Sequence, residues 1–279
     1  MGESRARISL RGAEAVAWSV GTTQLLWKPK RAIWDRTAPV LFPVCGWTRG
    51  GAVRVGKKSF PLGLHGFAHS QMFTLAGQGS DHVSLRLADN EATRALYPFA
   101  FDLTLTYRLE ARGLTVHATV FNPGAEPFPY AFGLHPGFVW PAGKARGQSR
   151  IVFDKAEEPM VPRIATGGLF SQLRRAVRLE GKALPLSDAL FEREAVCFLD
   201  ARSRGLTFEG PQGRLRVEVE DFPHWVLWSK PGAPFLCIES WTGTGDPEGF
   251  TGDLFEKPGM IYLAPGTSRH HSARYVFTA

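Results

Sequence analysis

Alternation of apolar and polar residues is the feature of this sequence that most restricts its fold. Residues 102–110 read Asp-Leu-Thr-Leu-Thr-Tyr-Arg-Leu-Glu, and residues 114–120 repeat the alternation after a turn that contains Gly113. Similar runs cover residues 83–87 and 214–220. Successive side chains of a strand point to opposite faces, so each run predicts a strand with one buried and one wetter face. The first two runs predict a β-hairpin.

Helical periodicity is nearly absent, and only residues 170–175 and 187–194 are consistent with short helices. Thirty glycines and twenty prolines punctuate the chain at intervals that suit strand–turn–strand connections. We interpret residues 157–168, which contain two prolines and two glycines, as a loop within the domain. The sequence therefore predicts an all-β fold, a large antiparallel β-sandwich with few short helices, formed as a single domain by residues 1–279.

The formal net charge is +7, but the basic residues are spread along the chain without a run of five or more. This distribution favours a solvated basic surface and predicts no nucleic-acid partner. No stretch approaches 18 apolar residues, so no membrane span is predicted. Charged residues before Ala15 interrupt the apolar core that a signal peptide needs. We therefore expect a cytoplasmic protein.

Cysteine spacing and the missing motifs narrow the chemistry. Cys45, Cys197 and Cys237 are far apart and form no CxxC or Cys/His ligand pattern, so we expect neither disulfides nor a metal. No GxGxxG after a strand, P-loop, HExxH or GxSxG is present, which disfavours cofactor-dependent redox chemistry, phosphoryl transfer and serine hydrolysis. A glycosidase with two carboxylates stays open.

Glu239 is a candidate general base. It follows residues 235–238, Phe-Leu-Cys-Ile, which predict a buried strand, and it precedes Trp241 by two residues. A carboxylate in such surroundings is costly unless it is paired, bound to a ligand or shifted in pKa. Glu239 is therefore either a base that works near neutral pH or the first exposed residue at a strand end.

Histidines and tryptophans in turn-rich segments supply the other candidates. His135 lies in a glycine-rich turn, and His65 and His69 lie within residues 63–69; each is either a proton-transfer or binding group or a hydrogen-bonded structural residue. Tryptophan rings offer an apolar face on which a sugar ring can lie, although core packing is the alternative. The tryptophans considered are Trp34, Trp47, Trp140 and Trp241.

Five segments together resemble the aldose 1-epimerase superfamily, in its compact bacterial branch. Each segment is short, but all five follow in the family's order over roughly 240 residues. They are residues 38–46, 64–68, 90–99 (Asn-Glu-Ala-Thr-Arg, then Tyr-Pro-Phe), 133–136 (Gly-Leu-His-Pro) and 237–243 (Cys-Ile-Glu-Ser-Trp-Thr-Gly). The resemblance implies a galactose mutarotase-like supersandwich with a sugar bound in an open cleft.

The resemblance also implies residue roles. Glu239 matches the family's general base, which removes the proton from the anomeric hydroxyl, and His135 matches the general acid, which protonates the ring oxygen. His65 matches a second histidine that binds substrate, and Asp246 matches an acidic residue expected to bind a hydroxyl group. No cofactor or metal is needed for this chemistry. The implied partner is a small-molecule sugar, and the implied assembly is a monomer or a homodimer.

Three positions depart from the family pattern. The family often has Arg after the glycine at position 46, where this chain has Trp47, although Arg49 two residues later could replace the contact. The family usually has Arg where His69 stands, and Pro where Ser240 stands. We retain Trp47, Arg49, His69 and Trp241 as substrate-binding candidates. A regulatory sugar-binding protein and a hexose-6-phosphate 1-epimerase remain as alternatives to a mutarotase.

Overall fold

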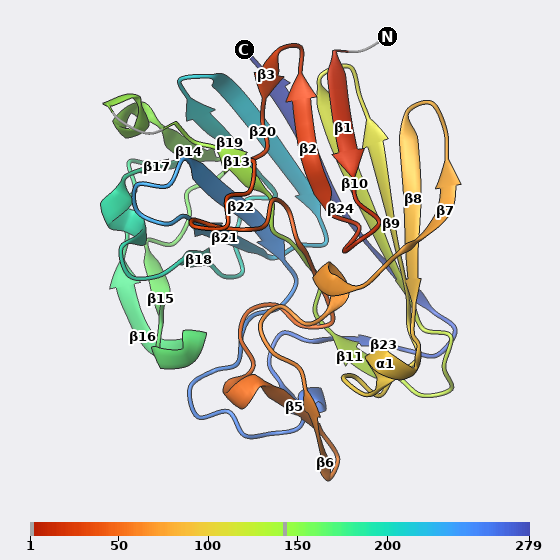
Figure 1. Ribbon diagram of the computed structural model, residues 1–279. Helices are drawn as coiled ribbons and strands as arrows, with labels where there is room; N and C mark the ends of the chain where they lie inside the picture. Colours follow the sequence, from red (N-terminus) through yellow and green to blue (C-terminus); the bar gives the residue numbers. More distant parts are fainter. Residues whose placement is uncertain (1–2, 142–143) are drawn as a thin grey trace.

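Two antiparallel sheets form the frame of the molecule (Figure 1), in a computed structural model that describes residues 3–141 and 144–279. Within these residues the larger sheet contains nine strands. Their spatial order is β17 (Ala183–Pro185), β14 (Arg150–Phe153), β19 (Gly205–Gly210), β20 (Gly213–Glu220), β24 (Ser268–Thr278), β10 (Gly113–Phe121), β9 (Asp102–Leu109), β8 (His82–Ala88) and β7 (Thr74–Gln78).

The smaller sheet contains six strands among the described residues. Five of them lie in one consecutive order, and the sixth, β13, pairs with β22. The order is β18 (Val196–Phe198), β21 (His224–Trp228), β22 (Phe235–Trp241), β12 (Gly133–Leu134) and β4 (Val40–Leu41), with β13 at Gly137–Val139. A separate sheet is formed by β1 (Ser4–Ile8), β2 (Ala15–Val20) and β3 (Thr23–Gln24). Further two-stranded pairs are β5 (Ala52–Val55) with β6 (Lys58–Pro61), β11 (Phe128–Tyr130) with β23 (Ile261–Leu263), and β15 (Met160–Ile164) with β16 (Phe170–Ala176).

Helices are short. The α-helix α1 covers Glu91–Arg94 and begins at Asn90, whose side chain accepts a hydrogen bond from the Thr93 backbone amide, as an N-cap residue does. The 3₁₀ helices are Arg49–Gly51, Ala68–Ser70, Lys144–Gln148, Thr166–Gly168, Asp188–Phe191 and Leu254–Glu256. No helix in the described part of the chain is long and apolar enough to cross a membrane.

The core lies between the two sheets. Along β9 the buried side chains alternate with polar ones, as the sequence pattern predicts. Aromatic contacts join the sheets at two places: the rings of Phe138 on β13 and Tyr275 on β24 are 5.6 Å apart, and those of Phe153 on β14 and Phe198 on β18 are 4.9 Å apart. Such pairs stabilise the packing beyond the apolar area that they bury.

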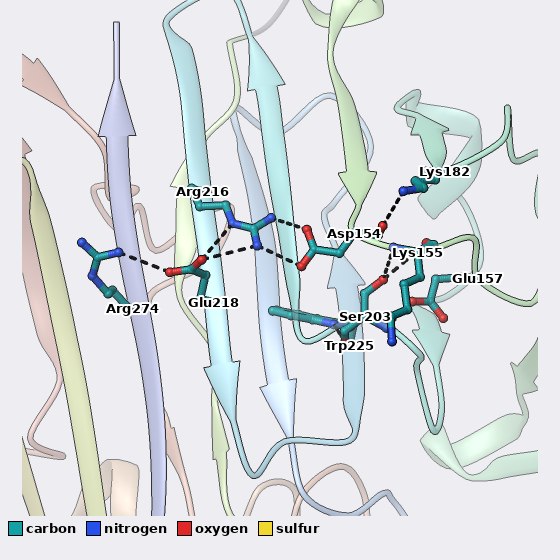
Figure 2. Close-up of polar contacts among 9 residues, drawn as sticks. All are labelled: Asp154, Lys155, Glu157, Lys182, Ser203, Arg216, Glu218, Trp225 and Arg274. Carbon is teal, nitrogen blue, oxygen red and sulfur yellow. Dashed lines mark hydrogen bonds and ion pairs between the residues drawn. The ribbon is translucent and has the colours of Figure 1, made fainter.

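The outer face of the larger sheet carries rows of charged side chains. Figure 2 shows the Arg216 guanidinium on β20 binding the Asp154 carboxylate with two hydrogen bonds, at 2.5 and 2.9 Å. Glu218 lies between Arg216 and Arg274 of β24 in the same view. Exposed ion pairs individually contribute little to the free energy of unfolding. This row of charged side chains therefore mainly keeps one face of the sheet hydrated and adds little stability to the fold.

The predicted all-β sandwich is confirmed, as are the hairpin formed by β9 and β10 and the strands at residues 83–87 and 214–220. Two local predictions are wrong. Residues 170–175 form strand β16 and not a helix, and residues 157–168 contain strand β15 instead of only a loop. The two segments pair with each other as a hairpin, a tertiary contact that neither pattern shows alone. Residues 187–194 hold a single 3₁₀ turn, Asp188–Phe191.

Candidate active site

A cavity of about 490 Å³ lies against the smaller sheet. This volume is in the range of small-molecule binding sites, roughly 300–1,000 Å³. Its walls come from β18, β21 and β22, from the turn after β12, and from loops near residues 34–47 and 64–69. Of the predicted site residues, six line it: Trp47, His65, His69, His135, Glu239 and Trp241.

Strand pairing brings His135 and Glu239 together. Strand β12 pairs with β22 in antiparallel register, with Leu134 opposite Ser240. This register places His135, the residue after Leu134, opposite Glu239, the residue before Ser240. The Ile238 amide donates a hydrogen bond to the Pro136 carbonyl at 3.1 Å and continues the pairing past both residues. Backbone hydrogen bonds thus fix the separation of two residues that are far apart in sequence.

The two side chains meet in a buried contact. His135 Nε2 lies 3.3 Å from Glu239 Oε2, with the residues 7% and 1% exposed. Trp241 Nε1 donates a hydrogen bond to the same oxygen at 2.9 Å. Glu239 is thus a buried carboxylate whose position is held by an imidazole and an indole, and it is not an exposed residue at a strand end.

Burial moves the titration of both groups. Loss of hydration raises the pKa of Glu239 well above its usual range, and the Trp241 hydrogen bond opposes this only in part. Loss of hydration lowers the pKa of His135 to about 3. Both shifts favour the neutral forms, so the one proton that the contact can share lies on Glu239 and not on His135.

His65 is held in one orientation beside this pair. Its Nδ1 accepts a hydrogen bond from the Gly46 amide at 3.1 Å, so in the neutral ring the proton resides on Nε2. Burial, followed by the neighbouring His135, lowers the pKa of His65 and keeps the ring neutral. The ring is edge-on to those of His135 and Trp241, with centroids 5.3 and 5.4 Å away.

Close backbone packing supports His65. Its φ is +62°, and the following Gly66 has a φ of +69°. A Cβ at Gly66 would lie 2.2 Å from the Phe42 carbonyl oxygen, so glycine is required for the turn that presents His65.

Tryptophans form an apolar wall around the pair. The Trp34 ring lies 5.3 Å from the His135 ring at an interplanar angle of 30°, and Trp228 lies edge-on to both. On another wall Trp47, which is 44% exposed, lies against Gly168 of the hairpin formed by β15 and β16. A Cβ at Gly168 would come within 1.8 Å of the Trp47 ring, so glycine makes room for the indole.

Two of the predicted residues do not line the cavity. Asp246 is buried, with Oδ1 2.8 Å from Lys257 Nζ and Oδ2 accepting a hydrogen bond from the Arg49 backbone amide at 2.8 Å. Arg49 is exposed and contributes this amide to the contact. This contact joins two loops, and the expected roles of Asp246 in binding a hydroxyl group and of Arg49 in binding substrate stay predictions.

Some residues that line the cavity were not predicted from the sequence to bind a ligand. Arg36 lines the cavity and donates a hydrogen bond to the His69 carbonyl at 3.2 Å. Arg36 and burial together lower the pKa of His69 to about 4, with burial the larger cause. Trp228 and the hairpin residue Phe170 also line the cavity. A Trp-Asp-Arg run at residues 34–36 was the available signal for Arg36.

The low pKa of His135 predicts how stability depends on pH. Between the ordinary value of 6.5 and the native value of about 3, the unfolded chain binds a proton that the native protein does not. The free energy of unfolding should therefore fall as pH is lowered through this window, by at most about 1.4 kcal/mol per pH unit from this residue. His135→Asn should weaken the dependence.

Urea unfolding between pH 4.5 and 6.5 tests this expectation. His69 and Glu239 titrate in both proteins, so the difference between the two pH slopes isolates His135. Equal slopes for wild type and variant would contradict a buried neutral imidazole at this position.

Comparisons with known proteins agree with the fold. A family model described as aldose 1-epimerase matches residues 2–276. The plasmid-encoded protein LacX of Lactococcus lactis subsp. lactis is 29% identical over 255 residues, which cover 87% of this chain and 85% of that protein.

Two solved structures superpose over the whole chain. A galactose mutarotase related enzyme from Lactobacillus acidophilus has a TM-score of 0.91 and 26% identity, covering 100% of this chain and 96% of that one. A galactose mutarotase-like protein from Lactobacillus casei has a TM-score of 0.94 and 26% identity, covering 100% and 98%.

Proposed function

Because the chain belongs to the aldose 1-epimerase family, we propose that it interconverts the α and β anomers of an aldohexose by acid–base ring opening. Glu239 is the base and His135 the acid. The observation that carries the proposal is the 3.3 Å contact between His135 Nε2 and Glu239 Oε2 at the wall of a cavity large enough for a sugar.

Ring opening moves one proton off the sugar and returns one. The Glu239 carboxylate takes the proton of the anomeric O1 hydroxyl as the C1–O1 bond gains double-bond character. The C1–O5 bond breaks, and the His135 imidazolium gives its proton to O5. The open aldehyde rotates about C1–C2, and the same steps in reverse close the ring on the other carbonyl face.

The electrostatics of the pair suit this cycle. Glu239 and His135 are both ionised before ring opening and both neutral after it, with no net change in protons. Burial favours the neutral pair, and transfer of one proton from Glu239 to His135 across their 3.3 Å contact gives the charged pair that the cycle uses. Because ring closure returns the pair to the same charge state, the cycle can run in both directions, as a reaction between anomers requires.

The surrounding residues support sugar binding. His65 presents an Nε2 proton, which is a donor suited to an oxygen of the sugar ring. Trp34, Trp47 and Trp241 give the cavity apolar faces against which C–H groups of a pyranose can pack. We propose His69 as a further polar contact at the wall.

Charge in the cavity favours a neutral sugar. Arg36 lines it together with its neighbour Asp35, and these opposite charges largely offset each other. A phosphate dianion needs a cluster of cationic groups, and the histidines here have lowered pKa values.

Residues that line the cavity range from Trp34 to Trp241, so we also propose that the chain works as one domain.

We expect faster anomer exchange for glucose or galactose than for glucose 6-phosphate. Saturation-transfer or exchange NMR on the three sugars measures each rate against the uncatalysed reaction at the same pH. Preference for the phosphorylated sugar would contradict the assignment of a neutral substrate. Absence of exchange on all three by folded protein would favour a sugar-binding role.

A further inference from the structure

A third ligand-type side chain lies beside the proposed acid–base pair. Cys237 precedes Glu239 by two residues on β22, so both side chains point to the same side of the strand. One ligand atom each of His135, Cys237 and Glu239 all lie within 4.8 Å of one another, and the three residues are buried. Cys237 is a free thiol and has no part in the proposed ring opening.

The spacing matches that of ligands around one tetrahedral metal ion. Zinc binds imidazole nitrogen and carboxylate oxygen at about 2.0–2.2 Å, which places two such ligands about 3.3–3.5 Å apart at a tetrahedral angle. His135 Nε2 and Glu239 Oε2 are 3.3 Å apart without any movement. A thiolate at about 2.3 Å would lie about 3.6 Å from either ligand, and from the outer limit of 4.8 Å the Sγ atom reaches that position with a shift of roughly 1.3 Å.

Charge balance favours a divalent ion at this position. Metal binding would remove the thiol proton of Cys237 and the proton shared by His135 and Glu239. The resulting thiolate and carboxylate neutralise the two charges of the ion, so the buried complex is electrically neutral. The indole of Trp241 already donates to Glu239 and would orient the carboxylate toward the ion.

Ligand chemistry selects the kind of ion. Nitrogen, sulfur and carboxylate oxygen suit Zn²⁺ and Co²⁺, whereas Mg²⁺ and Ca²⁺ require oxygen ligands. Three protein ligands leave a fourth position for water. His135 and Glu239 line the cavity and the buried Cys237 does not, so an ion would reach the site from the side of the histidine and the glutamate.

We propose that His135, Cys237 and Glu239 form a binding site for a single zinc-type ion, which occupies the acid–base pair and blocks it. The metal site goes beyond the proposed function, because the family reaction needs no metal and the bound ion would inhibit that reaction.

Cobalt(II) is the probe that reports directly on the thiol. Wild-type protein titrated with Co²⁺ should develop a thiolate-to-metal charge-transfer band in the near ultraviolet, and Zn²⁺ should bleach it. Cys237→Ala and Cys237→Ser should show no band; the serine variant keeps the side-chain volume. Cys197→Ala is the matched control, because Cys197 is also buried and lines the cavity but lies outside the cluster, and it should keep the band.

Inhibition by Zn²⁺ gives a second measurement. The concentration of Zn²⁺ that halves anomer exchange should be at least about tenfold higher in the Cys237 variants than in wild type, since one ligand is lost. Three results would each overturn the proposal: the wild type shows no band, the band survives in both Cys237 variants, or the band is lost in Cys197→Ala. The band requires no turnover, so an inactive protein that shows it would retain the metal site while refuting the mutarotase.

Discussion

Glu239→Gln should abolish anomer exchange while leaving the fold intact. Glutamine has nearly the shape of glutamate and can keep the hydrogen bond from Trp241 Nε1 through its carbonyl oxygen. It cannot accept the proton of O1, because an amide is not basic. Removal of a general base typically costs a factor of about 10²–10⁴ in rate. Exchange NMR of the variant and the wild type, at equal folded concentration, measures the loss.

A second buried glutamate provides the control. Glu157 is 7% exposed, lies outside the cavity and accepts hydrogen bonds from the backbone amides of Arg202 and Ser203. Glu157→Gln makes the same chemical change and should lower stability without lowering the rate per folded molecule. Near-wild-type exchange in Glu239→Gln would remove Glu239 from the mechanism and with it the proposed proton cycle.

His135→Asn should produce a loss of similar size, about 10²–10⁴-fold. Asparagine resembles the inner half of the imidazole ring but ends short of Nε2, the atom that contacts Glu239. It also cannot take up a proton near neutral pH. Without the acid, O5 must leave as an alkoxide or take its proton from water, and Glu239 loses its partner. The same exchange measurement applies, with circular dichroism to check the fold.

His224 is the matched histidine for this experiment. It lies on β21, is 6% exposed, and its Nδ1 accepts a hydrogen bond from the Asp200 amide at 3.0 Å. The carbonyl oxygen of asparagine can accept that bond, so His224→Asn should keep most of the exchange activity. If His135→Asn and His224→Asn behaved alike, His135 would be a packing residue and the proton donor would have to be found elsewhere.

The sheet structure was predictable where one strand face is polar. The alternation in residues 102–110 and 114–120 directly reports one buried and one solvated face, and both segments are strands in the structure. Residues 170–176 were not predictable in this way, because the sequence Phe-Ser-Gln-Leu-Arg-Arg-Ala carries little alternation and forms its strand by pairing with β15. That pairing depends on a hairpin contact and not on local preference.

The acid–base candidates could be named from the sequence, but their contact could not. The segments around His135 and Glu239 stand out through glycines, a proline and an apolar strand, whereas the register of β12 against β22 decides that the two residues meet. Long-range register is invisible in a single sequence. For the same reason the sequence could not show that Asp246 pairs with Lys257 on a distant loop.

The cavity wall was the least predictable part. Arg36 and Trp34 come from an irregular segment, and Phe170 comes from the hairpin, so neither spacing nor alternation marks them as neighbours of Glu239. A loop that contributes to a site has no periodicity by which its position can be read. The three cysteines show the same limit, because the proximity of Cys237 to His135 and Glu239 exists only in the folded chain.

One part of the site has a geometry fixed by the pairing of β12 with β22, and another part is formed by side chains that can be exchanged. The separation of acid and base is set by main-chain hydrogen bonds, which persist when neighbouring side chains change. Another wall, where Trp47 lies against Gly168 near Phe170, is built from side chains on a loop and a hairpin outside the two large sheets. We therefore expect exchange of Trp47 and Phe170 to change the sugar preference of the proposed mutarotase while the contact between His135 and Glu239 is kept, and a laboratory selection that diversifies these two residues would test it.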